Sequence, residues 1–141
     1  MSFFQKISLL LLRVSFGWLF LYSGITKLLN PDWSAAGYIG GASTLSSLYQ
    51  WLAQPGILPW VNFLNEWGQV FLGVALILGF FVRPAAITGA VLMLLYYFPV
   101  LAFPLVGEHS YIVDEHILYA LALLILAAFK AGRVWGIDSR L

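Results

Sequence analysis

Residues 60–103 read WVNFLNEWGQVFLGVALILGFFVRPAAITGAVLMLLYYFPVLAF, and this stretch decides the fold. It contains two apolar runs, residues 60–82 and 84–103, and each is long enough for an α-helix to cross the hydrocarbon core of a bilayer. The runs meet at Arg83 and Pro84, where proline suits the first turn of a new helix and leaves almost no loop. We therefore expect two membrane-spanning helices that form a tight antiparallel hairpin.

Two more apolar runs of spanning length flank this pair, at residues 7–29 and 112–129. The first is too long for a signal peptide, contains Arg13 and lacks a small-residue cleavage site near its end. The chain shows no internal repeat and no low-complexity linker. Residues 1–141 are therefore predicted to form a single all-α domain, an integral membrane four-helix bundle.

The composition supports a membrane location. Of the 141 residues, 62% are hydrophobic and 9% are charged, whereas a soluble domain carries roughly a quarter charged residues. The excess apolar side chains must face lipid. The net charge of +1 and the scattered basic residues argue against nucleic acid as a partner. The absence of cysteine excludes thiol chemistry, so a redox role needs a bound cofactor or a quinone.

Charged residues are distributed unequally between the two predicted sides of the bundle. Six basic residues fall on one side, and only Lys27 falls on the other. The positive-inside rule then places both termini in the cytoplasm and predicts a multi-pass protein of the cell membrane. The six are Lys6, Arg13, Arg83, Lys130, Arg133 and Arg140, and the acids near the external side are Asp32, Glu66, Glu108, Asp114 and Glu115.

Residues 30–59 connect the first two spans and are neither apolar enough to span nor polar enough to be disordered. Their aromatic side chains, among them Trp33 and Tyr49, favour the depth of the lipid headgroups. Residues 44–53 place Leu45, Leu48, Tyr49 and Leu52 on one side of a short amphipathic helix. We expect an interfacial segment that roofs the outer end of the bundle.

Polar residues inside a spanning helix are costly and default to the bundle interior, so they indicate candidate functional groups. A polar stripe of Asn62, Asn65, Glu66, Gln69 and Gly73 recurs at three- and four-residue spacing on the second span. Glu66 lies about 9 Å along the helix from Trp60, too deep for a surface charge. It is a candidate proton-transfer group, although pairing with Lys27 and the helix dipole also explains it.

A second polar group begins the fourth span at residues 111–116. Asp114 suits a helix N-cap and Glu115 the first turn, which is a structural explanation for both acids. His116, with Tyr119 one turn further in, is a candidate proton carrier or hydrogen-bond donor to a carbonyl. A metal site built from His109 and these residues is not predicted, because the spacing matches no strong ligand pattern.

The first span carries Arg13, Gly17, Gly24 and Lys27. Glycines at this spacing allow close approach of a neighbouring helix. Arg13 either snorkels to the cytoplasmic headgroups or binds a ligand. Lys27, near the outer end, either neutralises the acids there or binds an anion.

Several of these groups are predicted to surround the outer mouth of the bundle, and they form a small pocket with proton-transfer chemistry. They are Lys27, Trp33, Glu66, Asp114 and His116. The residues alone do not specify a reaction, because no nucleotide loop, hydrolase elbow, zinc-protease motif or haem-ligand pair is present.

Over most of its length the sequence resembles the DoxX-like membrane proteins, and within them the DoxD-type subunit of thiosulfate:quinone oxidoreductase. The resemblance rests on RVSFGWLFLYSGITKLLNP at residues 13–31, the GGAST and LYQWLAQPG segments within residues 40–56, GVALILGFFVRPAAITGAVLMLLYY at 73–97, VDEHILYALALLILA at 113–127 and AGRVWGID at 131–138. The most specific element is the one that contains Asp114, Glu115, His116, Tyr119 and Ala120.

The resemblance implies a four-helix membrane subunit that passes electrons from thiosulfate, or another small reductant, to membrane quinone. The implied electron acceptor is the quinone, with no metal or flavin, and the implied partners are the bilayer, a second subunit of a redox complex and, as an open alternative, further copies of the chain. Glu66, Asp114 and His116 are then the candidate catalytic residues. The candidate substrate-binding residues are Lys27, Trp33, Glu115, Tyr119 and Arg13.

Two alternatives remain open from the sequence. Some DoxX-like proteins act as non-catalytic assembly or partner proteins of redox complexes, and a small transporter is a weaker reading because no inverted halves are evident. A thiosulfate dianion would also meet five acidic residues at the outer face. Either some of these acids are protonated or paired, or the substrate is not an anion.

Overall fold

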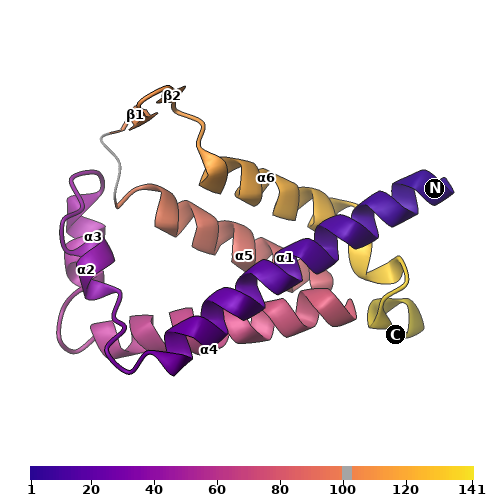
Figure 1. Cartoon of the computed structure of the whole chain (residues 1–141), viewed down its shortest axis with the longest axis horizontal. Coiled ribbons are helices and arrows are strands. Elements are labelled where there is room, and N and C mark those ends of the chain that lie inside the picture. Colours follow the sequence, from indigo (N-terminus) through magenta and orange to yellow (C-terminus); the bar gives the residue numbers. More distant parts are fainter. Residues whose placement is uncertain (100–102) are drawn as a thin grey trace.

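The computed structural model describes residues 1–99 and 103–141 and is mostly helical (Figure 1). The described residues form six α-helices, a two-stranded antiparallel hairpin and two 3-10 turns. In chain order the elements are α1 (Phe3–Leu29), α2 (Ala36–Ile39), α3 (Ser46–Leu52), α4 (Leu58–Leu78), α5 (Val82–Tyr97), β1 (Leu105–Gly107), β2 (Ser110–Tyr111), α6 (Glu115–Ala128), η1 (Ala131–Arg133) and η2 (Ile137–Arg140).

Helices α1 and α4 form the most extensive packing contact of the molecule (Figure 1). Glycines let the two backbones approach closely. A Cβ atom on Gly17 would lie 2.6 Å from Ile77 Cγ1, and one on Gly73 would lie 2.5 Å from the Leu21 amide nitrogen. Neither position has room for a side chain, so these glycines determine the spacing of α1 and α4.

Helices α5 and α6 form the second close pair. Their contact faces are rich in small and aliphatic residues, because α5 buries Ala86, Gly89 and Ala90 while α6 buries Ala120 and Leu123. Helices α1 and α6, in contrast, contact each other over a much smaller area. The molecule is therefore two helix pairs rather than four equally packed helices.

The expected tight hairpin of the second and third spans is only half correct. The short connection is confirmed, since only Gly79, Phe80 and Phe81 separate α4 from α5. The tight packing is wrong, because α4 and α5 diverge from this turn and pack mainly on α1 and α6 respectively. The faces of α4 and α5 that carry small residues point toward α1 and α6 respectively. Hydropathy alone does not show which face of a helix meets which neighbour.

Each of the four predicted spans contains a helix, with altered limits. Helices α1 and α4 are long and apolar enough to cross a membrane by length and composition, whereas α5 and α6 are shorter apolar helices. The third predicted span continues to residue 103, but residues 100–102 lie outside the described part of the chain. The fourth was predicted from residue 112, and α6 begins at Glu115 because Asp114 caps it.

Helices α2 and α3 lie at the end where the two helix pairs diverge (Figure 1). The predicted short helix within residues 44–53 is confirmed as α3. Tyr49 of α3 is 1% exposed, and its hydroxyl donates a 2.7 Å hydrogen bond to the Leu95 carbonyl of α5. The Tyr38 hydroxyl of α2 donates a bond of the same length to the Tyr96 carbonyl. The connecting segment is thereby fixed onto the end of α5.

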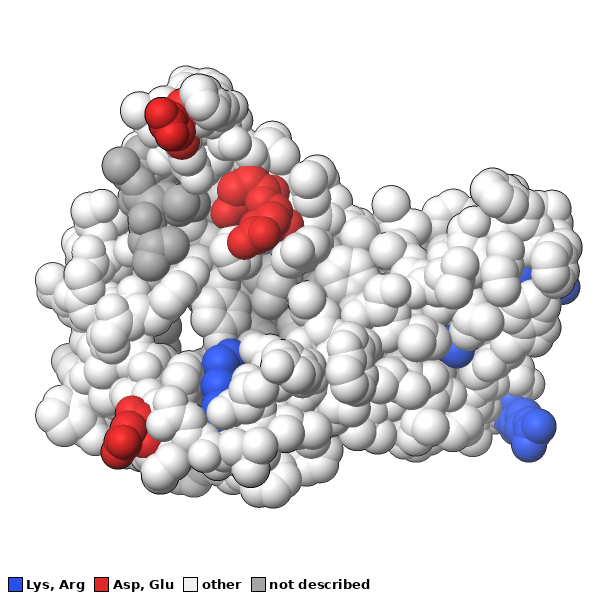
Figure 2. Space-filling view, in the orientation of Figure 1, with Lys and Arg blue, Asp and Glu red and all other residues white. Residues whose placement is uncertain are grey.

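The opposite end carries both chain termini and is closed by the C-terminal turns (Figure 1). Asp138 accepts hydrogen bonds from the Phe81 and Val82 amides, at 2.8 and 3.0 Å, and so caps the start of α5. Figure 2 shows Lys and Arg mostly at this end and Asp and Glu at the other, on the face drawn. This unequal distribution of charge is the basis on which the positive-inside rule predicts cytoplasmic termini.

The close contact of α1 and α4 at Gly73 predicts that a single added methyl group there destabilises the protein. Gly73→Ala forces the α1 and α4 backbones apart and is expected to lower the free energy of unfolding by about 2 kcal/mol. Gly68, on the same helix, has no atom within 4 Å of its would-be Cβ, so Gly68→Ala is expected to be neutral or slightly stabilising. Unfolding of both variants in detergent measures the difference, and equal stabilities would refute the close contact.

Candidate functional site

Lys27 lies near the C-terminal end of α1 and is the centre of a partly buried hydrogen-bond network. Its Nζ donates to Gln69 Oε1 at 2.7 Å, to the Tyr96 hydroxyl at 3.0 Å and to Ser23 Oγ at 3.2 Å. A lysine ammonium has three donors, so all of them are used. The partners are neutral oxygens, and the positive charge stays uncompensated by any direct ion pair in the described part of the chain.

Tyr96 of α5 joins three helices through its hydroxyl. The hydroxyl accepts from Lys27 and, at 3.3 Å, from Gln69 Nε2, while it donates to Asn65 Oδ1. Lys27 Nζ also lies 5.2 Å from the centroid of the Tyr96 ring and 5.1 Å from that of Trp33. Aromatic faces stabilise a cation at these distances. The network therefore holds the outer parts of α1, α4 and α5 together.

His116, in the first turn of α6, forms a pair with Asp114. His116 Nδ1 lies 2.8 Å from Asp114 Oδ2, and Asp114 Oδ1 accepts a 3.1 Å hydrogen bond from the Ile117 amide. The predicted N-cap at Asp114 is thus confirmed. A carboxylate that holds one imidazole nitrogen leaves the other available to a ligand, which is the arrangement used in general acid–base chemistry.

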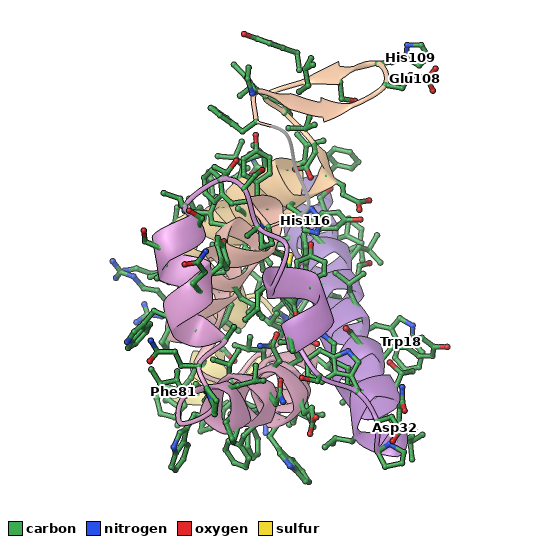
Figure 3. The ribbon with its side chains drawn as sticks, turned by 90° about the vertical axis from the view of Figure 1, so that its left-hand side faces the viewer. Trp18, Asp32, Phe81, Glu108, His109 and His116 are labelled. Atoms are coloured by element: carbon green, nitrogen blue, oxygen red, sulfur yellow. The ribbon has the colours of Figure 1, made fainter. Side chains whose placement is uncertain are left out.

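The His116 ring also packs against the Lys27 network. Its centroid lies 6.4 Å from that of Tyr96 in a stacked arrangement, and 6.5 Å from that of Tyr119 in an edge-on one. Figure 3 shows His116 among the ribbons, whereas Glu108 and His109 lie at the far tip of the β-hairpin. The described residues contain no group of three or more His, Asp or Glu side chains that could hold a metal ion.

Two cavities share Lys27, Tyr38 and Tyr96 as a common wall. The cap cavity, about 270 Å³, lies beneath α2 and α3 and is mainly apolar. The α1–α6 cavity, about 430 Å³, contains the His116 and Tyr119 rings. Its lining is Leu19, Phe20, Tyr22, Ser23, Thr26, Lys27, Tyr38, Gln69, Met93, Tyr96, His116 and Tyr119.

The α1–α6 cavity continues as a groove between the two loosely packed helices. The next hollow, about 350 Å³, shares Leu19 and Tyr119 with it and extends to Leu12 and Ala122. A separate hollow, about 560 Å³, lies between the start of α1 and the end of α6 and shares no lining residue with the other two. The two connected hollows form a groove that spans about 22 Å along α1. We call this feature the α1–α6 groove.

Burial keeps the two tyrosines of the capping segment in their neutral form. It raises the pKa of the Tyr49 hydroxyl to about 12 and also raises the pKa of Tyr38. Nearby acids, Asp114 and Glu115, raise the Tyr38 pKa further. Both hydroxyls therefore remain protonated donors to the α5 carbonyls at neutral pH.

The structure brings together four of the eight predicted site residues and connects a fifth through His116. Lys27, Tyr119 and His116 line the α1–α6 cavity, Trp33 lies over Lys27, and Asp114 holds His116. The other three are Glu66, Glu115 and Arg13.

These three lie outside both cavities. Glu66 is half-buried on α4 and forms no hydrogen bond or ion pair with the described residues, so the alternative of a direct pair with Lys27 is not realised. Glu115 is exposed in the first turn of α6. Arg13 lies about 21 Å from Lys27 along α1.

Arg13 is 1% exposed and therefore does not snorkel to the headgroups. Its Nη1 donates to the Ala131 and Val134 carbonyls, at 2.7 and 3.0 Å. The buried guanidinium thus ties the first helix to η1 and the segment that follows it.

Sequence reasoning missed the central role of Tyr96 and saw Gln69 and Asn65 only as members of a polar stripe. Gln69 is 2% exposed and bonds to Lys27 and Tyr96. One signal in the sequence could have indicated this role. Tyr96 lies near the end of the span that follows the polar stripe, and a buried tyrosine hydroxyl usually has a hydrogen-bond partner.

Comparison with known proteins identifies one family. The model of the DoxX family matches residues 8–102, which is more than half of the chain and extends from α1 through α5. No curated protein and no solved structure matches the chain. The matched range includes Lys27, Gln69 and Tyr96, while Asp114 and His116 follow it.

Loss of the Tyr96 hydroxyl is predicted to destabilise the protein. Tyr96→Phe leaves buried donors of Lys27 and Gln69 without an acceptor, which is expected to cost about 1–3 kcal/mol of unfolding free energy. Tyr22→Phe is the matched control, because Tyr22 is 60% exposed and forms no hydrogen bond with the described residues. Thermal unfolding in detergent compares them, and a Tyr96→Phe melting curve equal to that of Tyr22→Phe would contradict the network.

Proposed function

Because the chain belongs to the DoxX family, we propose that this membrane protein is the quinone-binding subunit of an oxidoreductase. It passes electrons from thiosulfate, or another small reductant, to membrane quinone. In this proposal the four long helices form a membrane bundle in the cell membrane, with both termini cytoplasmic. The observation that carries the proposal is the α1–α6 cavity, where the His116–Asp114 pair and the Lys27 network meet a groove open to lipid.

The chemistry of the α1–α6 cavity suits the head of a quinone. A quinone head is a flat ring with two carbonyl acceptors, and the cavity offers the aromatic walls Phe20, Tyr96 and Tyr119. In its doubly protonated form, His116 can donate from Nε2 to one carbonyl while Nδ1 donates to Asp114. The volume of about 430 Å³ is within the range of small-molecule sites.

Reduction of a quinone consumes two electrons and two protons, and the oxidation of two thiosulfates to tetrathionate supplies the two electrons. In this proposal His116 delivers one proton to the quinone, and the contact between Asp114 and His116 Nδ1 supports it by fixing the orientation of the ring. Glu66 lies outside the cavity, half-buried on α4 and three residues from Gln69, so we propose it as a relay for the second proton and not as a direct donor to the quinone.

The same geometry argues against thiosulfate in this cavity. All three donors of Lys27 are used by neutral partners, so a dianion would have to displace one of them. Glu115 and Asp114 add negative charge near the mouth, which opposes an incoming anion. We therefore assign sulfur oxidation to a site formed with a second subunit, outside the α1–α6 cavity. That subunit must also supply the redox cofactor that carries the two electrons from the sulfur site to the quinone.

A non-catalytic role as a partner or assembly protein of a redox complex is the second candidate. One observation favours it: Lys27, Gln69 and Tyr96 satisfy each other without a ligand, as a purely structural network would. This function requires neither the free nitrogen of His116 nor the groove. Quinone binding therefore discriminates between the two candidates.

Substitution of His116 tests the proposal. His116→Gln is expected to lower kcat for thiosulfate-dependent quinone reduction by about 100-fold, because general acid catalysis is lost. His109→Gln is the matched control, since His109 is exposed in the β-hairpin. Anaerobic absorbance of a quinone analogue measures the rate in native membranes, and quinone titration of the purified chain measures binding. Full activity of His116→Gln would refute the site, and absence of quinone binding by the wild-type chain would favour the partner role.

Blocking the α1–α6 groove is predicted to act on long-tailed quinones alone. Ala122→Phe fills the part of the groove away from Lys27 and is expected to raise KM for a long isoprenoid quinone about tenfold. A short-tailed analogue needs only the cavity at His116 and should be unaffected. Leu124→Phe, at a position on α6 that is exposed and outside the groove, provides the control. Equal KM changes for both tail lengths would show that the groove does not hold the tail.

A further inference from the structure

A second polar hollow lies at the end of the molecule that carries both termini, far from His116. It has a volume of about 330 Å³ and is lined by three basic side chains that come from α5, the α6–η1 junction and η1. These are Arg83, Lys130 and Arg133. We call this hollow the basic pocket.

The charge of the basic pocket is not neutralised within the part of the chain that the structure describes. Arg83, Lys130 and Arg133 form no ion pair there. Asp138 is the acidic side chain of the lining, but its two carboxylate oxygens already accept hydrogen bonds from the Phe81 and Val82 amides. Three cations therefore face one carboxylate that is already used as a helix cap.

The backbone of η1, which carries Arg133 and directly follows Lys130, is held in place by contacts with α1 and α5. Arg13, buried in α1, donates to the carbonyls of Ala131 and Val134, on either side of Arg133. Gly132 packs so closely that a Cβ there would lie 2.9 Å from Val82 Cγ2. The basic side chains thus project from a fixed platform, which lowers the entropy lost when they bind a shared ligand.

Exposed aromatic side chains surround the basic pocket, as is expected at the depth of lipid headgroups. Phe81, which lines the pocket, is 58% exposed, and Trp135 nearby is 52% exposed. Trp135 packs against Phe3, with ring centroids 5.9 Å apart. Exposed aromatic residues at the end of apolar helices are typical of a membrane–water interface.

We propose that the basic pocket binds the phosphate of an anionic phospholipid. Arginine matches phosphate oxygens with two parallel hydrogen bonds, and the pocket lining supplies two arginines, Arg83 and Arg133, while Lys130 adds a third charge. The acyl chains of the lipid then lie along the exposed aromatic side chains at this end. The ligand is a lipid rather than free phosphate, because the pocket adjoins the apolar surface that faces the bilayer.

Native mass spectrometry of the detergent-purified full chain tests this site. The probes are phosphatidylglycerol, phosphatidylcholine with the same acyl chains, and inorganic phosphate. One phosphatidylglycerol molecule is expected to be retained in preference to phosphatidylcholine. Removal of one charge by Arg83→Gln or Arg133→Gln should lower that affinity about fivefold.

Matched controls separate a site from general surface charge. Lys6→Gln and Arg140→Gln remove exposed basic residues outside the pocket and should leave the preference unchanged. Arg133→Lys keeps the charge and should restore most of the binding, and circular dichroism verifies that each variant is folded. Equal retention of both lipids, an equal loss in Lys6→Gln, or displacement of the lipid by millimolar phosphate would overturn the proposal.

Discussion

The close approach of α1 to α4 at their glycines is the constraint on which the rest of the structure depends. Gly17 and Gly73 leave no space for a side chain, so the two backbones lie in direct contact. This contact brings Lys27 of α1 to Gln69 of α4. It also turns α1 away from α6, and the space between them becomes the α1–α6 groove. The packing of α1 on α4 thus leaves a groove between the two helix pairs.

The Lys27 network shows how an apolar bundle accommodates a cation. Transfer of a charge out of water is costly unless hydrogen bonds replace hydration. Here three oxygens and two aromatic faces surround the ammonium, and they come from α1, α4, α5 and the segment after α1. The same residues form one wall of the α1–α6 cavity. The groups that hold the helices together therefore also line the cavity that we propose for the quinone.

The sequence predicted the positions of the helices better than it predicted which helices pack against each other. Hydropathy identifies which segments avoid water, and it located α1, α4, α5 and α6 to within a few residues at most ends. It does not identify which apolar face meets which, so the pairing of α4 with α1 was missed. The β-hairpin at residues 105–111 was missed as well, because it is very short and adjoins the predicted fourth span.

The sequence identified those members of the candidate site that are charged or polar side chains within apolar segments. Lys27 and His116 stand out in apolar runs, and the structure places both in one cavity. Tyr96 did not stand out, since tyrosine is common near membrane surfaces.

The hydrogen bond between Arg13 and the Ala131 carbonyl has a consequence for biosynthesis, because the two residues are 118 positions apart. At ordinary translation rates, Ala131 is added to the chain on the order of ten seconds after Arg13. The ribosome must therefore add Ala131 to the chain before the Arg13 side chain can form this hydrogen bond.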